Sequence, residues 1–295
     1  MIQPLLNSST LIFTFRPRAV NDNHLAPALQ TAKMLATKLK SELVAASVGG
    51  EVRQEWSKDF LEDSGENVWT QFILRDETSN ANAAADLVSS RSGKSAEAVI
   101  VVTHLPKSPV AKIFQHFTSN LLSVVKYPVI AINAKSPSLT DVRKSLFVTD
   151  LSKEEKVQFR RALRWAKKLD VELVIGNCLL SPWELDRSVA PIGISSVITI
   201  DDKMMKDSHE AHKIANVWIN EARDVGVRAS FEHVTGHLSV STGMLEAAKD
   251  LGADFIIISR KNKSKIVATL LGSTLSEVLA GFSGPVMILP SLSEN

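Results

Sequence analysis

The chain has 295 residues, of which 44% are hydrophobic and 22% are charged, and this composition excludes a disordered protein. Its 34 basic residues nearly balance its 32 acidic residues, so the net charge of +2 argues against a nucleic-acid-binding protein. Cys178 is the single cysteine, which excludes an internal disulfide and a cysteine-based metal cluster. The sequence starts without the charge pattern of a signal peptide and has no membrane-length apolar run, so we expect a cytoplasmic protein.

The first half of the chain alternates apolar segments with segments of helical spacing. Residues 11–15 predict a short buried strand, and apolar residues between 25 and 39 recur on one face of a helix. The elements expected after these are a strand at 42–44, a strand at 68–74, a helix at 83–88, a buried strand at 98–103 and a proline-started strand at 128–132. Alternating strands and helices of this kind indicate a parallel sheet that is covered on both faces.

The second half repeats this order. Residues 146–150 predict its first strand, and a helix over 159–169 follows, with Ser152 and Glu155 in the spacing of a capping box. The later elements expected are strands at 172–174, 227–234, 254–259 and 285–289 and a helix at 244–251. Residues 38–44 and 168–174 read KLKSELV and KLDVELV, so the correspondence extends to individual letters. We infer an internal duplication.

The duplication predicts the domain organisation. We expect two tandem, doubly wound α/β domains, residues 1–137 and 141–295, joined by a short linker between them. The offset between matching segments grows along the chain, so the second domain carries about 26 extra residues between its second and fourth strands. This insertion either covers a cleft or packs on the domain as a surface excursion.

Five short segments of the second half are distinctive in their order along the chain. They are VTDLS at 148–152, the alanine-rich helix after it, GADFII at 252–257, LGS at 271–273 and GPV at 284–286. In this order they resemble the universal stress protein family, and the first half resembles it mainly through its likeness to the second. The resemblance implies adenine-nucleotide α-hydrolase-like domains whose last strands, 129–132 and 286–289, pair to form an intrachain pseudo-dimer, with a homodimer as a further expectation.

The resemblance also implies where a ligand would bind. The nucleotide-binding members of the family carry a loop of pattern G-2x-G-9x-G-[ST], in which backbone N–H groups approach phosphates, and an aspartate at the end of the first strand. The candidate residues that follow all lie in the second domain: Asp150, Ser259, Asn262, Gly272, Ser273 and Thr274. Ser259 and Asn262 stand where the first two glycines belong. In the first domain Phe15 replaces the aspartate and Pro106 a glycine, so we expect no ATP binding there.

Other polar groups leave alternatives open. His209 and His212 have helical spacing, and His233 and His237 follow, but surface histidines explain this pattern as well as metal ligands do, so no metal site is predicted. The basic run at 260–265 either holds an anion or is a solvated loop. Neither Gly-x-Ser-x-Gly nor a P-loop motif occurs, and no catalytic residue is assigned.

Two hypotheses for the function result. The first is a non-catalytic stress-response or regulatory protein that senses a small molecule or contacts a regulatory protein, with no membrane or nucleic-acid partner. The second is an ATP-binding switch or slow ATPase that uses the second domain only. No cofactor is assigned on the first hypothesis, and ATP is the cofactor on the second.

Overall fold

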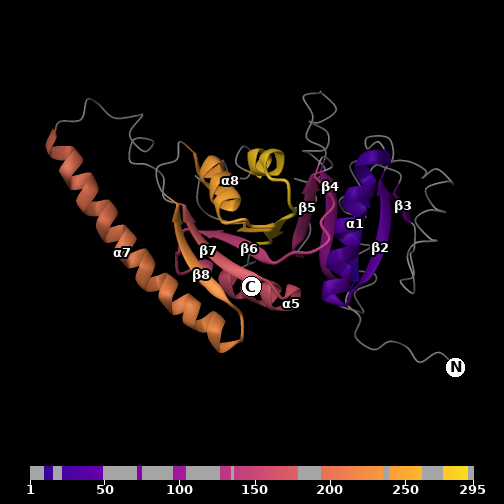
Figure 1. The fold of residues 1–295 in the computed structure, drawn as a ribbon, viewed down its shortest axis with the longest axis horizontal. Coiled ribbons are helices and arrows are strands. Elements are labelled where there is room, and N and C mark those ends of the chain that lie inside the picture. The colour runs from indigo at the N-terminus through magenta and orange to yellow at the C-terminus, as the bar shows by residue number, and fades with distance from the viewer. Residues whose placement is uncertain are drawn as a thin grey trace. The chain divides into compact units, whose positions relative to one another are not determined.

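Figure 1 shows the fold in a computed structural model of the chain. The structure describes residues 10–15, 22–48, 72–74, 96–103, 127–133, 136–178, 194–234, 239–260 and 275–291. The chain divides into two compact units, of which the first is Met1–Asp141 with Phe282–Asn295 and the second is Val142–Gly281. Within the described segments, every helix is too short or too polar to span a bilayer.

The first unit is built on a sheet in the strand order β3-β2-β1-β4-β5-β10. Its described elements are β1 (Thr10–Phe15), α1 (Asp22–Leu39), β2 (Glu42–Val48), β3 (Phe72–Leu74), β4 (Ala96–Thr103), β5 (Val129–Asn133) and β10 (Val286–Leu289). β1 lies between β2 and β4 and is parallel to both. Leu11 and Phe13 of β1 and Ala32 and Leu35 of α1 are buried, which gives this unit its core. The helix expected at 83–88 lies outside the described residues.

The second unit contains four parallel strands in the order β9-β6-β7-β8. Its described elements are β6 (Lys144–Thr149), α5 (Glu155–Leu169), β7 (Glu172–Cys178), α7 (Ile194–Asp224), β8 (Ala229–Val234), α8 (Val240–Asp250), β9 (Phe255–Ser259) and helical residues 275–281. α5 and α8 lie on opposite faces of the sheet (Figure 1). The predicted α/β fold with helices on both faces is therefore confirmed for this unit.

α7 lies within the part of the chain where the insertion was expected. It is 31 residues long and precedes β8. Residues 179–193, which include the start of the insertion, lie outside the described segments. α7 packs against β8 and against α5, because Trp218 stacks on Phe159. The described portion of this region is thus a long helix whose C-terminal part packs on the domain.

The first helix of each unit ends in the same way. Lys40 after α1 and Asp170 after α5 both have left-handed backbone conformations, with φ of 51° and 54°. The next amide N–H group bonds back to the helix in both cases, from Ser41 to the Ala36 carbonyl and from Val171 to the Ala166 carbonyl. These residues stand at matching positions of KLKSELV and KLDVELV, so the internal similarity extends to backbone geometry.

The C-terminal strand pairs with the first unit. Val286 to Ile288 of β10 run antiparallel to Val129 to Ala131 of β5, while the other described strand pairs of this unit are parallel. β10 follows the second unit in the sequence, where it was expected as that domain's closing strand. Its partner β5 is the other strand that the resemblance singled out.

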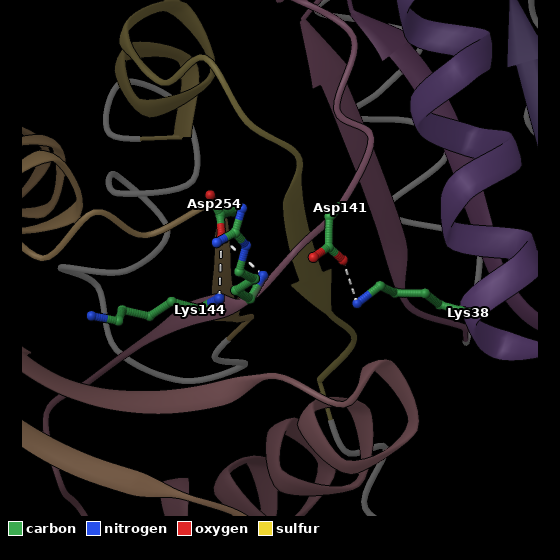
Figure 2. A network of polar contacts seen from close by, with 5 residues as sticks. Lys38, Asp141, Lys144 and Asp254 are labelled. Carbon is green, nitrogen blue, oxygen red and sulfur yellow. Dashed lines mark hydrogen bonds and ion pairs between the residues drawn. The ribbon is translucent and has the colours of Figure 1, made fainter.

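Two aspartate side chains, Asp141 and Asp254, form polar contacts near residue 141 and at the start of β9. In the first unit Lys38 forms an ion pair with Asp141 at 2.7 Å. In the second, the Asp254 carboxylate accepts hydrogen bonds from the backbone N–H groups of Arg143 at 2.9 Å and Lys144 at 3.2 Å (Figure 2). The Asp254 N–H group in turn donates to the Lys144 carbonyl. These bonds set the alignment of β6 with β9.

Candidate functional site

The sheet of the second unit has its switch point between β6 and β9. The strand that follows β6 in the chain, β7, lies on one side of β6 in the sheet. β9 lies on the other side of β6. Crossovers that leave in opposite directions open a crevice beyond the carboxyl ends of the strands, where open α/β sheets bind ligands. The groups at these strand ends therefore form the candidate site.

Asp150 follows β6 and holds the loop that enters α5. Its Oδ1 atom accepts a hydrogen bond from the Ser152 N–H group at 3.0 Å, as in an Asx turn. The Thr149 hydroxyl accepts from the Leu151 N–H group, also at 3.0 Å, and Leu151 has a φ of 58°. Asp150 is exposed, as a ligand-contacting residue would be. The structure thus places this candidate at the switch point with one carboxylate oxygen engaged by its own loop.

The predicted capping box at the start of α5 is wrong. α5 begins at Glu155, and the side chain of its N-cap residue, Glu154, makes no capping hydrogen bond. Ser152 therefore does not serve as the N-cap, because the turn held by Asp150 delays the helix start. Glu155 is only 2% exposed, although it lies in the first turn of a helix.

The Glu155 side chain reaches the end of β9. The Ser259 hydroxyl is 2.7 Å from both carboxylate oxygens of Glu155 and donates its hydrogen to them. Ser259 stands at the first glycine position of the expected phosphate loop. The Glu155 oxygens accept this hydrogen bond, so they present acceptors where a phosphate group needs donors.

A row of polar side chains crosses the same edge of the sheet. Thr149 of β6 pairs in register with Asn177 of β7, and Asn177 pairs with His233 of β8. Asn177 is 2% exposed, and its Nδ2 donates to the Thr149 carbonyl at 3.1 Å. Asn177 Oδ1 and both ring nitrogens of His233 are buried without a hydrogen-bond partner among the described residues. No sequence motif singles out Asn177; its position next to Cys178 at the end of a predicted strand was the available signal.

His233 lies against α7. Its ring centroid is 6.0 Å from that of His212, with the planes inclined by 20°, and 6.0 Å from that of Phe231. Burial lowers the pKa of His233, the neighbouring His212 lowers it further, and Glu232 partly opposes the shift. His209 is exposed on α7, and His237 lies outside the described residues. The described residues contain no group of three or more metal-ligating His, Cys, Asp or Glu side chains.

The structure describes only part of the predicted site. Asn262, Gly272, Ser273 and Thr274 fall outside the described residues, as does the basic run after Arg260. Of the predicted set, the structure therefore describes Asp150 and Ser259, which follow or end the adjacent strands β6 and β9. Cys178 is the last residue of β7.

Comparison with known proteins supports the resemblance. The family model described as the universal stress protein family matches residues 142–290. No protein of curated function matches the chain.

Solved structures share the fold. A universal stress protein from Archaeoglobus fulgidus DSM 4304 superposes with a TM-score of 0.61 at 14% identity, covering 98% of both chains. A protein of Pseudomonas aeruginosa UCBPP-PA14 assigned to the universal stress proteins gives 0.59 at 15% identity, covering 96% of this chain and 93% of its own. A functionally unknown protein from Pseudomonas aeruginosa PAO1 gives 0.60 at 14% identity with the same coverage. At these identities the likeness concerns the fold alone.

Proposed function

Because the chain belongs to the universal stress protein family, we propose that it is a cytoplasmic, non-catalytic stress-response module that binds a small molecule or a regulatory protein through its second unit. The observation that carries this proposal is the buried Glu155 carboxyl group on Ser259. It puts acceptor oxygens at a position where the family's nucleotide-binding loop needs backbone donors.

The hydrogen-bond acceptors at the candidate site support a ligand other than a phosphate. Three acceptors lie in this region: Glu155 in the first turn of α5, Asp150 in the turn after β6 and Asn177 Oδ1 near the end of β7. A phosphate also presents only acceptors to the protein, so each of these contacts would be repulsive or unpaired. A ligand or peptide that carries N–H or O–H donors makes attractive contacts with such acceptors instead.

The first unit has the role of a structural partner in this proposal. β10 pairs with β5, and this pairing covers a strand edge that would otherwise be open to other chains. The pairing supports an intrachain pseudo-dimer in which the last strands of the two sequence repeats pair with each other. A homodimer of such chains is compatible with this pairing.

An ATP-binding switch or slow ATPase in the second unit is the alternative function. The exposed position of Asp150 at the switch point favours it, since a carboxylate there can contact a ribose or base. In that case Glu155 must leave Ser259 when the nucleotide enters, which would cost the hydrogen bond between them.

Calorimetry with ATP and Mg²⁺ on the full-length chain separates the two functions. We expect no binding heat at millimolar ATP for the wild type and for Glu154→Ala, a matched change at the exposed neighbouring position. Submillimolar binding that Asp150→Ala abolishes would overturn the module and establish the nucleotide function. Glu155→Ala tests the cause: a gain of ATP binding in this variant alone shows that the carboxylate is what excludes phosphate.

A further inference from the structure

The structure brings together two histidines that are distant in sequence. His212 lies on α7 and His233 on β8, and their ring centroids are 6.0 Å apart. Phe231 lies beside both rings, with its centroid 4.9 Å from that of His212. The apolar neighbour gives the imidazoles no hydrogen bond. The pair is therefore a local cluster of nitrogen groups outside the crevice contacts of Glu155 and Ser259.

Within the described part of the chain, the hydrogen bonds of the pair leave ring nitrogens without partners. His212 Nδ1 is 2.8 Å from the Ser208 carbonyl oxygen. A carbonyl can only accept, so Nδ1 carries the hydrogen and Nε2 keeps a lone pair. This is the arrangement that fixes the tautomer of metal-ligating histidines. In His233 neither nitrogen has a partner among the described residues, although both are buried.

We propose that His212 and His233 bind one divalent transition-metal ion, which joins α7 to β8. Imidazole nitrogens suit Zn²⁺, Ni²⁺ and Cu²⁺. An ion about 2.0–2.1 Å from one nitrogen of each ring would hold the centroids about 5 Å apart at a tetrahedral angle and about 6 Å apart in a linear arrangement. The observed 6.0 Å lies at the upper end of this range.

The chemistry of the neighbourhood agrees with this assignment. His233 presents its two unpartnered ring nitrogens beside His212, and a neutral imidazole nitrogen is the form that binds a metal ion. Glu232 is next in sequence and supplies a negative charge that favours a cation. The described residues offer no third His, Cys, Asp or Glu in the cluster, so His212 and His233 are the two protein ligands assigned to the ion.

The experiment uses the full-length chain, freed of metal with a chelator and titrated with ZnCl₂ by calorimetry at pH 7.5. We expect one ion per chain and at least about tenfold weaker binding in both His212→Gln and His233→Gln, because each loses one of two ligands. His212 is exposed, so its variant reports on binding even if the buried His233→Gln folds poorly. Zn²⁺ should also raise the melting temperature of the wild type but not of His212→Gln.

His209→Gln is the matched control, since His209 is an exposed histidine on the same helix. It should bind Zn²⁺ as the wild type does. Binding that is lost in His209→Gln but kept in His233→Gln would place the ion on α7 alone and overturn the proposal. Absence of binding in the wild type, or unchanged affinity in His212→Gln, would overturn it equally. The ATP titrations of the proposed function are independent of these results.

Discussion

Phe159 of α5 and Trp218 of α7 stack face to face, with ring centroids 4.6 Å apart and planes inclined by 19°. Both rings are buried, at 0% and 2% exposure. Phe159 also contacts Phe147 of β6, at a centroid distance of 6.4 Å. The three rings therefore connect the long helix to the central strand of the second unit, and they hold α7 where His212 meets His233.

Replacing Phe159 by Ala should lower the free energy of unfolding by about 3–5 kcal/mol, because the change leaves a cavity and removes the stacking partner of Trp218. Urea denaturation followed by circular dichroism measures it. Val217→Ala is the control, since Val217 precedes Trp218 on α7 but is 56% exposed. Its effect should stay within about 0.5 kcal/mol. Equal effects of the two changes would contradict the buried contact between α5 and α7.

Asp254 should contribute more to the stability of the chain than its position at the start of a strand suggests. Its carboxylate accepts from the backbone N–H groups of Arg143 and Lys144 (Figure 2), and hydrogen bonds to a charged group contribute about 1.5–3 kcal/mol. Asp254→Ala should therefore lower the free energy of unfolding by that amount, measured in urea. Asp254→Asn keeps an acceptor and should lose about half as much.

Asp250→Ala provides the comparison for Asp254. Asp250 is exposed at the end of α8, where a negative charge meets the negative end of the helix dipole. Its removal should leave stability unchanged or raise it by about 0.3–1 kcal/mol. If Asp250→Ala and Asp254→Ala destabilised the chain equally, the carboxylate bonds to β6 would not be what aligns β6 and β9.

The fold was largely predictable, because the spacing of apolar residues indicates the helices and strands and the sequence repeat indicates their order. The two KL-x-x-EL-V segments predicted matching helix ends, and the left-handed residues Lys40 and Asp170 are found there. Asp150 was a candidate because the family resemblance implies an aspartate after the first strand, and it follows β6 in the structure. The family model, over residues 142–290, agrees with the part of the chain where the resemblance was strongest.

The side-chain arrangement of the site was not predictable in the same way. The spacing of Ser152 and Glu155 predicts a local capping box, but the Glu155 carboxyl group bonds Ser259, which is more than a hundred residues away in the sequence. Likewise, Asn177 and His233 become neighbours only through the register of β7 with β8. The spacing of residues within a short segment indicates its local helix or strand propensity. These contacts depend instead on how distant segments pair in the folded chain, and tertiary pairing overrides local propensity.

His233 should make the stability of the chain depend on pH. Its pKa in the folded chain is below the ordinary value of 6.5, so the unfolded chain binds more protons just below that pH. Stability is therefore complete above about pH 6.5 and falls as the pH is lowered from there. The slope cannot exceed about 1.4 kcal/mol per pH unit, and solvent screening reduces it.

Thermal unfolding between pH 7.5 and 5.5, with a chelator present to exclude metal effects, measures this dependence. The melting temperature of the wild type should fall with pH more steeply than that of His233→Asn. His209→Asn should keep the wild-type slope, because His209 is exposed and is not among the groups that shift the pKa of His233. A slope that His233→Asn leaves unchanged would show that other groups are responsible.

Two substitutions of Asn177 separate the effect of a buried charge from the effect of a lost hydrogen bond. Its Nδ2 donates to the Thr149 carbonyl, so Asn177→Asp would set two acceptors against each other and bury a charge at a position that is 2% exposed. An uncompensated buried charge costs about 3–5 kcal/mol. Asn177→Leu loses the same hydrogen bond but also removes the unpartnered Oδ1, and should cost only about 1 kcal/mol.

The pH dependence of these two variants provides the decisive comparison. Lowering the pH protonates the introduced carboxyl group, which removes its charge and restores a donor toward the Thr149 carbonyl. The stability difference between Asn177→Asp and Asn177→Leu should therefore shrink from pH 8 toward pH 5, as measured by urea denaturation of both at each pH. A difference that stays constant would mean that the introduced carboxyl group turns to solvent, and that Asn177 is not enclosed at the end of β7.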